Sequence, residues 1–132
     1  MIVELAQLTI TPGRESEFEA AFTDAIKWAA DSKGYLAHEL RRSVENPSRY
    51  LLRIEWATLE DHTVGFRGSP AFTQWRAGVG PFFAVPPVVE HFRPVTGNMR
   101  YGVTRRRHSC GYASSSRLVS HAHPVAIDCA HF

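Results

Sequence analysis

A chain of 132 residues, 44% hydrophobic and 21% charged, has the size and composition of one soluble globular domain. It contains no run near the roughly 18 apolar residues that a membrane span needs, and no basic leader with a cleavage site, so we expect a cytoplasmic protein that does not enter a membrane. Its two cysteines, Cys110 and Cys129, both lie in the last quarter, which excludes a core organised by disulfide bonds.

The charge is divided unevenly along the chain. Up to Thr96 there are ten Lys and Arg against twelve Asp and Glu, a balance of −2, whereas from Gly97 onward there are five Arg and one Asp, a balance of +4. The same boundary ends the regular spacing of apolar residues. We therefore expect a folded domain over residues 1–96 and an irregular or disordered extension over residues 97–132.

The first predicted elements are a strand and a helix. In the opening sequence MIVELAQLTI, apolar residues occupy both alternating faces, which predicts a strand that is covered on both sides. Thr11 followed by Pro12 predicts the start of a helix, and apolar residues at three- and four-residue spacing continue it from about Gly13 to Asp31. We expect the helix to stop near Gly34.

Two strands that form a hairpin are predicted next, from Tyr35 to Ser43 and from Arg49 to Ala57, with a turn at Asn46-Pro47 between them. Alternation places one set of residues of each strand on a shared apolar face. These sets are Leu36, His38 and Leu40 in the first strand and Tyr50, Leu52, Ile54 and Trp56 in the second.

Two short helices and a closing strand complete the predicted domain. A capping pattern at Thr58 begins a helix that ends at Gly68, and Ser69 with Pro70 begins another that closes near Gly80. The segment PVVEHFRPV predicts the last strand. The order β-α-β-β-α-α-β is typical of an α+β ferredoxin-like sandwich, with helices on one face of a four-stranded sheet.

The face of this sheet that carries no helices would expose apolar side chains among its charges. A second copy of the chain, packed sheet to sheet, would cover that surface. We therefore expect a homodimer that forms through the sheet face.

Three segments follow one another in a distinctive order: MIVELAQLTITPGRESEFEAAF at the start, YLLRIEWATLEDH at the end of the hairpin, and FRGSPAFTQWR before the strand VVEHF. In this combination the chain resembles the antibiotic biosynthesis monooxygenase (ABM) domain family, whose members are dimeric α/β barrels. The resemblance covers about residues 1–95. It implies a pocket between the sheet and the helices of each subunit. The family includes quinol and anthrone monooxygenases without cofactors, haem-degrading enzymes and members with no assigned activity.

The resemblance implies that an aromatic substrate reacts with dioxygen in this pocket without a cofactor or metal. The anion of a phenol, quinol or anthrone can pass one electron to oxygen and recombine with it, if the protein supplies an apolar cavity, a base and a hydrogen-bond donor. We expect His62 as the base, the indole N–H of Trp75 as the donor, and Phe66, Phe72 and Trp56 as walls. Each residue also has a structural interpretation, as core packing for the aromatic rings and as a half-exposed polar residue for the histidine.

Three residues on strands are further candidates for contact with the substrate. His38 lies on an apolar face, where a histidine is usually a core residue. His91 faces either the pocket or the dimer interface. Arg53 either pairs with Glu55 or Glu39 or holds an oxyanion.

Two other functions stay open. One is a dimeric module with the same core that binds a small ligand or serves a structural role without catalysis. The other is haem degradation, which the sequence disfavours. The residues that haem-degrading members share are an asparagine on the first strand, a tryptophan and an iron-ligating histidine, and the corresponding places here hold Ala6 and Gln7, Gly65, and the tripeptide QWR.

The predicted extension contains six possible zinc ligands and one arginine triplet at 105–107. The spacing of the ligands matches no established structural site, and a single basic triplet without periodicity is weak support for nucleic-acid binding. We therefore expect neither a metal nor a nucleic acid to bind there. The possible ligands are His108, Cys110, His121, His123, Cys129 and His131.

Overall fold

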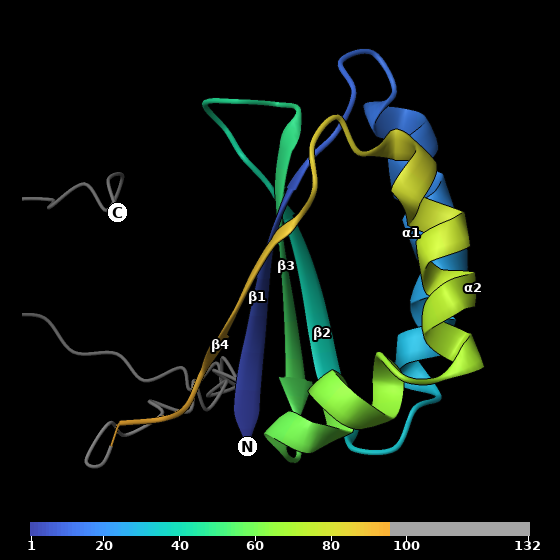
Figure 1. Ribbon diagram of the computed structural model, residues 1–132. Coiled ribbons are helices and arrows are strands. Elements are labelled where there is room, and N and C mark those ends of the chain that lie inside the picture. Colours follow the sequence, from blue (N-terminus) through green and yellow to red (C-terminus); the bar gives the residue numbers. More distant parts are fainter. Residues whose placement is uncertain (96–132) are drawn as a thin grey trace, which may run out of the picture. The chain divides into compact units, whose positions relative to one another are not determined.

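The computed structural model describes residues 1–95, and all expectations for residues 96–132, including the domain boundary, lie outside the described residues. The elements follow the predicted order (Figure 1). They are β1 (Ile2–Thr9), α1 (Glu15–Ala30), β2 (Tyr35–Arg42), β3 (Arg49–Trp56), η1 (Asp61–Phe66), α2 (Pro70–Val79), η2 (Gly80–Phe82) and β4 (Val88–Phe92).

The four strands form one sheet in the order β2-β3-β1-β4, and every neighbouring pair is antiparallel. Figure 1 shows α1 and α2 together on one side of this sheet. We call the side that the helices cover the inner face and the opposite side the outer face. This arrangement is the α+β ferredoxin-like fold that the sequence predicts.

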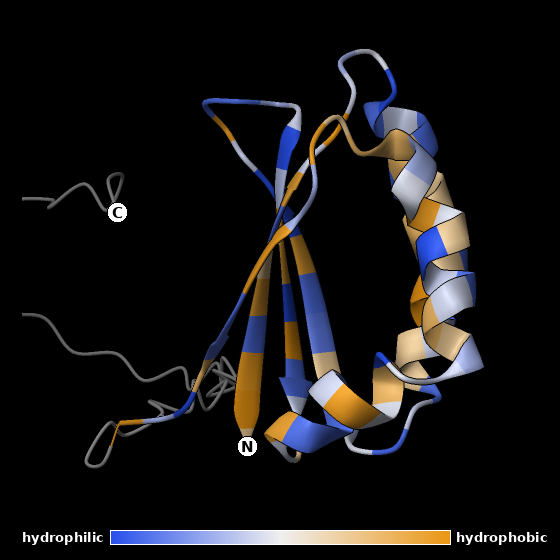
Figure 2. Ribbon diagram, viewed as in Figure 1, coloured by the Kyte–Doolittle hydropathy of each residue, from blue (hydrophilic) through white to orange (hydrophobic). Residues whose placement is uncertain are grey.

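The register of β1 decides which residues reach each face. Glu4 lies opposite Ile54 of β3 and Ala6 lies opposite Leu52, and all four are buried on the inner face. Successive side chains of a strand point to opposite faces, so Leu5 between them belongs to the outer face. The alternation is visible as hydrophobic and hydrophilic bands along the strands in Figure 2.

A register shift near the start of β2 corrects one expectation. The pairing with β3 skips a residue between Tyr35 and Ala37, so Leu36 does not share a face with His38 and Leu40 as predicted. Its side chain is 52% exposed. One extra residue in a strand reverses the alternation beyond it, and the position of such a bulge is not encoded in simple two-residue periodicity.

The start of α1 differs from the prediction as well. The helix begins at Glu15, because Gly13 adopts a left-handed φ of +91° and interrupts any helix that starts at Pro12. The hydroxyl of Thr11, which the sequence indicated as a helix cap, instead donates to the carbonyl oxygen of Phe82 at 3.2 Å. The turn therefore ties the end of β1 to the segment that follows α2.

The predicted caps of the two later helices are confirmed. The backbone N–H of Asp61 donates to the Thr58 hydroxyl at 3.1 Å, and that of Phe72 donates to the Ser69 hydroxyl at 3.4 Å, with Pro70 at the first helical position. The first of these helices, η1, is wound as a π-helix. Such wider turns are rare and often occur at functional sites.

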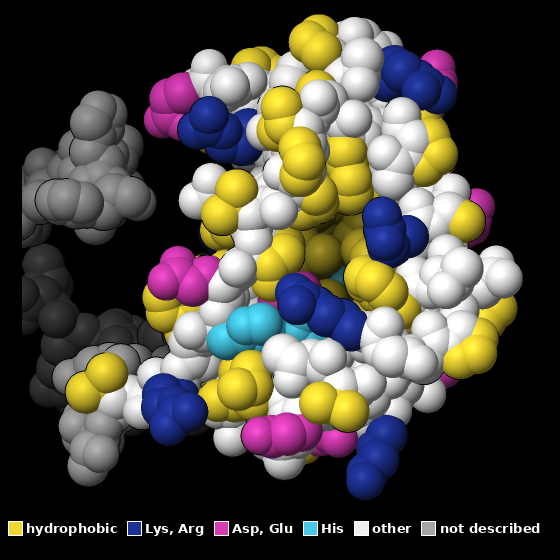
Figure 3. Space-filling model, viewed as in Figure 1, with side chains coloured by type: hydrophobic (Ala, Val, Ile, Leu, Met, Phe, Trp, Pro, Cys, Tyr) yellow, Lys and Arg dark blue, Asp and Glu magenta, His cyan; other side chains and the backbone are white. Residues whose placement is uncertain are grey.

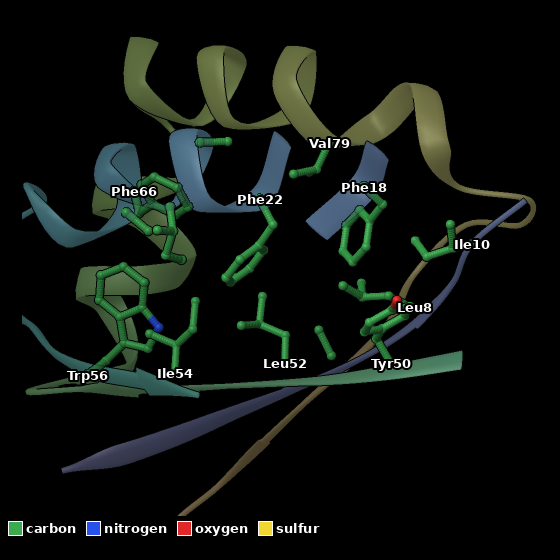
Figure 4. Packing of buried hydrophobic residues seen from close by; sticks show 14 residues of the cluster. Leu8, Ile10, Phe18, Phe22, Tyr50, Leu52, Ile54, Trp56, Phe66 and Val79 are labelled. Carbon is green, nitrogen blue, oxygen red and sulfur yellow. The ribbon is translucent and has the colours of Figure 1, made fainter. Parts of the chain in front are cut away.

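The core lies between the inner face and the two long helices. Figure 4 shows Trp56, Ile54, Leu52 and Tyr50 pointing from β3 toward the helices. Phe18 of α1 is fully buried against them, with its ring centroid 4.9 Å from that of Tyr50. Burial of a side chain of this size stabilises the fold by about 1.5–3 kcal/mol.

One glycine fixes how closely the helices pack above this core. A Cβ at Gly78 of α2 would stand 2.8 Å from the Cβ of Ala25 in α1. No larger residue fits there unless the helices separate, so this pair holds α2 against α1.

The outer face combines apolar and charged side chains. Leu51 and Val88 remain 39% and 63% exposed, while Arg53 donates to Glu55 of the same strand at 2.8 Å. Among the described residues, no helix is long and apolar enough to cross a membrane.

Candidate active site

A cavity of about 540 Å³ opens on the inner face, a size within the range of small-molecule sites. Figure 3 shows the hollow, with hydrophobic side chains inside it and basic and histidine side chains at its border. Its wall is formed by Glu4, Ala6, Leu8, Leu52, Ile54, His62, Phe66, Arg67, Phe72, Trp75, Arg76, Gly80, Phe83, Ala84, Val85, Pro86, Pro87 and Val89.

Glu4 is the one acidic side chain in this wall, and it is 6% exposed. Its Oε2 accepts a hydrogen bond of 2.9 Å from the indole Nε1 of Trp56. Burial raises the pKa of Glu4 above its usual value because it penalises the charged form, while the Trp56 hydrogen bond and the charge of Arg67 act in the opposite direction. Oε1 makes no hydrogen bond to any residue from 1 to 95.

His62 of η1 lies beside this carboxyl group and is 2% exposed. Its Nε2 lies 3.3 Å from Glu4 Oε2, and its Nδ1 shares a hydrogen bond of 2.7 Å with His91 Nε2. Its ring stacks on that of Trp56, with centroids 5.2 Å apart. Burial, followed by the charges of Arg67 and His91, lowers the pKa of His62 to about 3, so the ring is neutral near pH 7.

His91 occupies the position of β4 directly opposite Glu4 of β1. It is half-buried and does not line the cavity. Burial, and then the charge of Arg67, lowers its pKa as well. Residues from β1, η1 and β4 thus form a continuous series of polar groups that we call the polar chain, Glu4–His62–His91.

The aromatic wall contains three of the residues that the sequence indicated. Phe66 and Phe72 meet edge to face at 5.4 Å, and Trp75 packs against Phe22 of α1 at 5.7 Å. Trp75 is half-buried, and its indole nitrogen makes no hydrogen bond within the described part of the chain. This N–H is therefore available to a ligand.

Besides His91, three predicted contact residues do not line the cavity. Trp56 is fully buried behind His62, where it supports Glu4 and does not form the wall. Arg53 points to the outer face, because β3 alternates and its neighbours Leu52 and Ile54 point inward, and it pairs with Glu55 as in its structural interpretation.

His38 belongs to the inner face, as predicted, but lies over β2 and is exposed rather than part of the core. Its Nδ1 shares a hydrogen bond with the hydroxyl of Tyr35. Its ring packs edge to face against the ring of Phe22, with centroids 6.0 Å apart. It does not reach the cavity.

The sequence interpretation missed Glu4, Arg67 and Arg76. A signal for Glu4 was present, since it is the single acid on a strand face shared with Ala6 and Leu8. The two arginines carried no such signal, because arginine beside a helix end or on a helix surface is common. Within residues 1–95, no group of three or more His, Cys, Asp or Glu side chains is arranged to hold a metal ion.

Comparison with known proteins gives consistent results. The sequence profile of the family described as "Antibiotic biosynthesis monooxygenase" matches residues 1–78. The chain is 46% identical over 95 residues to the uncharacterised protein YczJ of Bacillus subtilis (strain 168). These 95 residues are 72% of this chain and the full length of YczJ.

Solved structures agree with this match. A family protein of Bordetella bronchiseptica has 41% identity and a TM-score of 0.69, over 71% of this chain and 96% of its own. A variant of SnoaB, a cofactor-independent oxygenase of Streptomyces nogalater, has the same fold at 17% identity and a TM-score of 0.62, over 70% of this chain and 91% of its own. The chain therefore belongs to the antibiotic biosynthesis monooxygenase family.

Proposed function

We propose that this chain is a monooxygenase that uses dioxygen, without a cofactor, to oxidise a quinol, anthrone or similar aromatic molecule in the cavity. The observation that carries the proposal is the polar chain Glu4–His62–His91 at the wall of an otherwise largely apolar cavity. Burial of such groups costs stability, which favours a catalytic use over a structural one. SnoaB, which shares the fold, is itself a cofactor-independent oxygenase.

The reaction needs a group that removes a proton from the substrate. The sequence favoured His62 for this role, but both of its nitrogens are occupied, one by His91 and one by the 3.3 Å contact with Glu4. Glu4 lines the cavity, keeps Oε1 without a hydrogen bond inside the described chain, and has a raised pKa, which makes it a stronger base than an exposed carboxylate. In our proposal Glu4 accepts the proton. His62 and His91 orient the Glu4 carboxyl group and transfer the proton from it toward solvent.

The remaining steps require no further protein base. For an anthrone, the anion at the CH carbon gives one electron to dioxygen, and the two radicals combine to form a C–O bond. The peroxide anion takes up one proton, and the hydroperoxide then loses water, which contains the second hydrogen of that carbon, to leave a carbonyl group. The overall change is CH₂ + O₂ → C=O + H₂O. Trp75 donates its indole N–H to the developing oxygen charge, while Phe66 and Phe72 hold the rings.

Glu4→Gln tests this assignment, because it keeps the size of the side chain and removes the base. We expect aerobic oxygen uptake with a panel of quinols and anthrones to fall about 10²–10⁴-fold. Glu90→Gln is the matched control, since this acid is exposed on β4 and belongs to the outer face, and its uptake should equal that of the wild type. Full uptake by a folded Glu4→Gln variant contradicts the role of Glu4. Ligand-induced thermal stabilisation of the wild type without any uptake favours the non-catalytic binding module.

We also propose that a second copy of the chain covers the outer face. This surface holds exposed Leu51 and Val88 beside the Arg53–Glu55 pair, in which two charges are matched within one strand. An interface between two such faces would remove the apolar surface from water, and the Arg53–Glu55 pair would enter it with its two charges already matched.

A further inference from the structure

Two arginines belong to the cavity wall but have no role in the proton transfer. Arg67 directly follows η1, and Arg76 lies on α2. Both line the cavity, and neither forms an ion pair with a carboxylate anywhere in residues 1–95. Figure 3 shows basic side chains at the border of the hollow. Two arginines from different parts of the chain therefore line the same cavity.

Local contacts place these two arginines beside the aromatic wall and the polar chain. The Arg76 guanidinium lies over the ring of Phe72, with Cζ 5.8 Å from the ring centroid, and so follows the aromatic wall. The backbone N–H of Arg67 donates to the carbonyl oxygen of His62 at 3.0 Å, which fixes the start of its side chain one turn from the polar chain. The charge of Arg67 also contributes to the lowered pKa values of His62 and His91, so its field extends to that group.

The charges in the wall do not balance. Two arginines stand against the single acid Glu4, whose pKa is raised, while His62 is neutral. The rest of the wall is mostly apolar, and the two exposed guanidinium groups favour an anion over a neutral group beside them. Among the residues of the wall, basic side chains therefore outnumber acidic ones.

We infer that Arg67 and Arg76 form a subsite for an anionic group of the ligand, and that the cavity takes an aromatic molecule that carries a carboxylate. This inference rests on the proposed function, because it names a substrate class for the same site. The ring would lie against Phe66, Phe72 and Trp75, and the carboxylate would meet the planar guanidinium groups, which bind carboxylates through two parallel hydrogen bonds. A neutral quinol fills the aromatic part of the cavity and leaves the arginines in water.

Binding of two matched probes tests the subsite without any turnover. Anthraquinone-2-carboxylate and anthraquinone-2-carboxamide have the same rings and are already oxidised, and they differ in charge. Calorimetry at pH 7 should show that the wild-type chain binds the carboxylate about tenfold more tightly. The preference should weaken as salt is raised, because ions screen exposed charges.

Arg67→Met and Arg76→Met should each reduce the preference, and the double variant should abolish it. Both residues are exposed, so these variants should fold, which thermal unfolding checks. Arg49→Met, which removes an exposed arginine away from the cavity, should keep the preference in full. Equal affinity of the wild type for the two probes, failure to bind the carboxylate, or a preference that survives in the double variant overturns the inference.

The outcome is separable from that of the proposed reaction. A carboxylate preference lost in the double variant, together with oxygen uptake that Glu4→Gln leaves unchanged, would establish the anion subsite and reject the role of Glu4. Loss of oxygen uptake in Glu4→Gln, together with equal binding of both probes by the wild type, would support the role of Glu4 and reject the anion subsite.

Discussion

The inner and outer faces of the sheet both carry apolar and polar side chains, but they distribute the polar ones differently. On the inner face most side chains are apolar, and the buried polar or charged residues of the described chain, Glu4 and His62, are both at the cavity. On the outer face charged and apolar side chains alternate, and Arg53 and Glu55 are paired within their own strand. Polar side chains are thus spread over the outer face, whereas the buried polar side chains of the inner face lie together at the cavity.

On the inner face, the residues that stabilise the fold and the residues proposed for catalysis occupy different parts. The part of the inner face around Phe18 and Tyr50 is filled by its own side chains, whereas the part around Glu4 and Ala6 borders open space. Filled apolar volume stabilises the fold, and buried polar groups beside a cavity oppose it. Substitutions in the two parts should therefore differ in which property they change.

The largest effect is expected in the filled part. Phe18→Ala removes a fully buried ring that contacts Tyr50 and Phe22, and the loss of packing and the cavity left behind should lower the free energy of unfolding by about 3–5 kcal/mol. Urea denaturation measures it. Leu36→Ala, at a position that is 52% exposed, should change stability by less than about 0.5 kcal/mol. Similar losses in the two variants would contradict the contrast.

A smaller effect, with a distinct pH dependence, is expected from the polar part. The pKa of His62 is about 3 in the folded chain and near 6.5 when unfolded, so between these values the unfolded state binds the additional proton. Burial of the ring in its neutral form therefore has no cost from protonation above pH 6.5, and the free energy of unfolding decreases as the pH falls from 6.5 toward 3. From pH 7 to pH 4 this loss amounts to roughly 3 kcal/mol. Glu4 acts in the opposite direction, because its raised pKa lets the folded state take up a proton first.

Denaturation of the wild type and of His62→Gln at pH 7, 6, 5 and 4 measures this contribution. The wild type should lose more stability in acid than the variant, so the difference between them should shrink or reverse by pH 4. His38→Gln is the matched control, since this histidine is exposed, and its profile should parallel that of the wild type. Parallel profiles of wild type and His62→Gln would show that the ring is not held neutral by burial.

The same contrast explains what the sequence could predict. Strand alternation and the caps at Thr58 and Ser69 are local patterns, and they predict the order of elements, whereas the family and the aromatic wall followed from the resemblance of whole segments. The polar chain depends on strand pairing, which brings His91 of β4 opposite Glu4 of β1, residues 87 positions apart. The unusual turn of η1 at His62 and the bulge at Leu36 also depend on tertiary contacts. Local periodicity contains no information about these.

The smallest of the three effects should appear on the outer face, where Leu51 lies between Gln7 of β1 and Arg41 of β2 and is 39% exposed. Leu51→Asp should barely alter the single chain, because the side chain is already partly in water. Within the proposed dimer it would bury an unpaired carboxylate, and association should weaken about 10- to 100-fold, or roughly 1.5–3 kcal/mol.

Sedimentation equilibrium over a dilution series measures this association. Val44→Asp, at a residue that is 90% exposed in the turn between β2 and β3, adds the same charge away from the outer face and should leave association unchanged. A wild-type chain that sediments as a monomer at all concentrations, or a Leu51→Asp variant that associates like the wild type, would show that this face is not the interface. Its paired charges would then serve to keep the exposed apolar residues soluble.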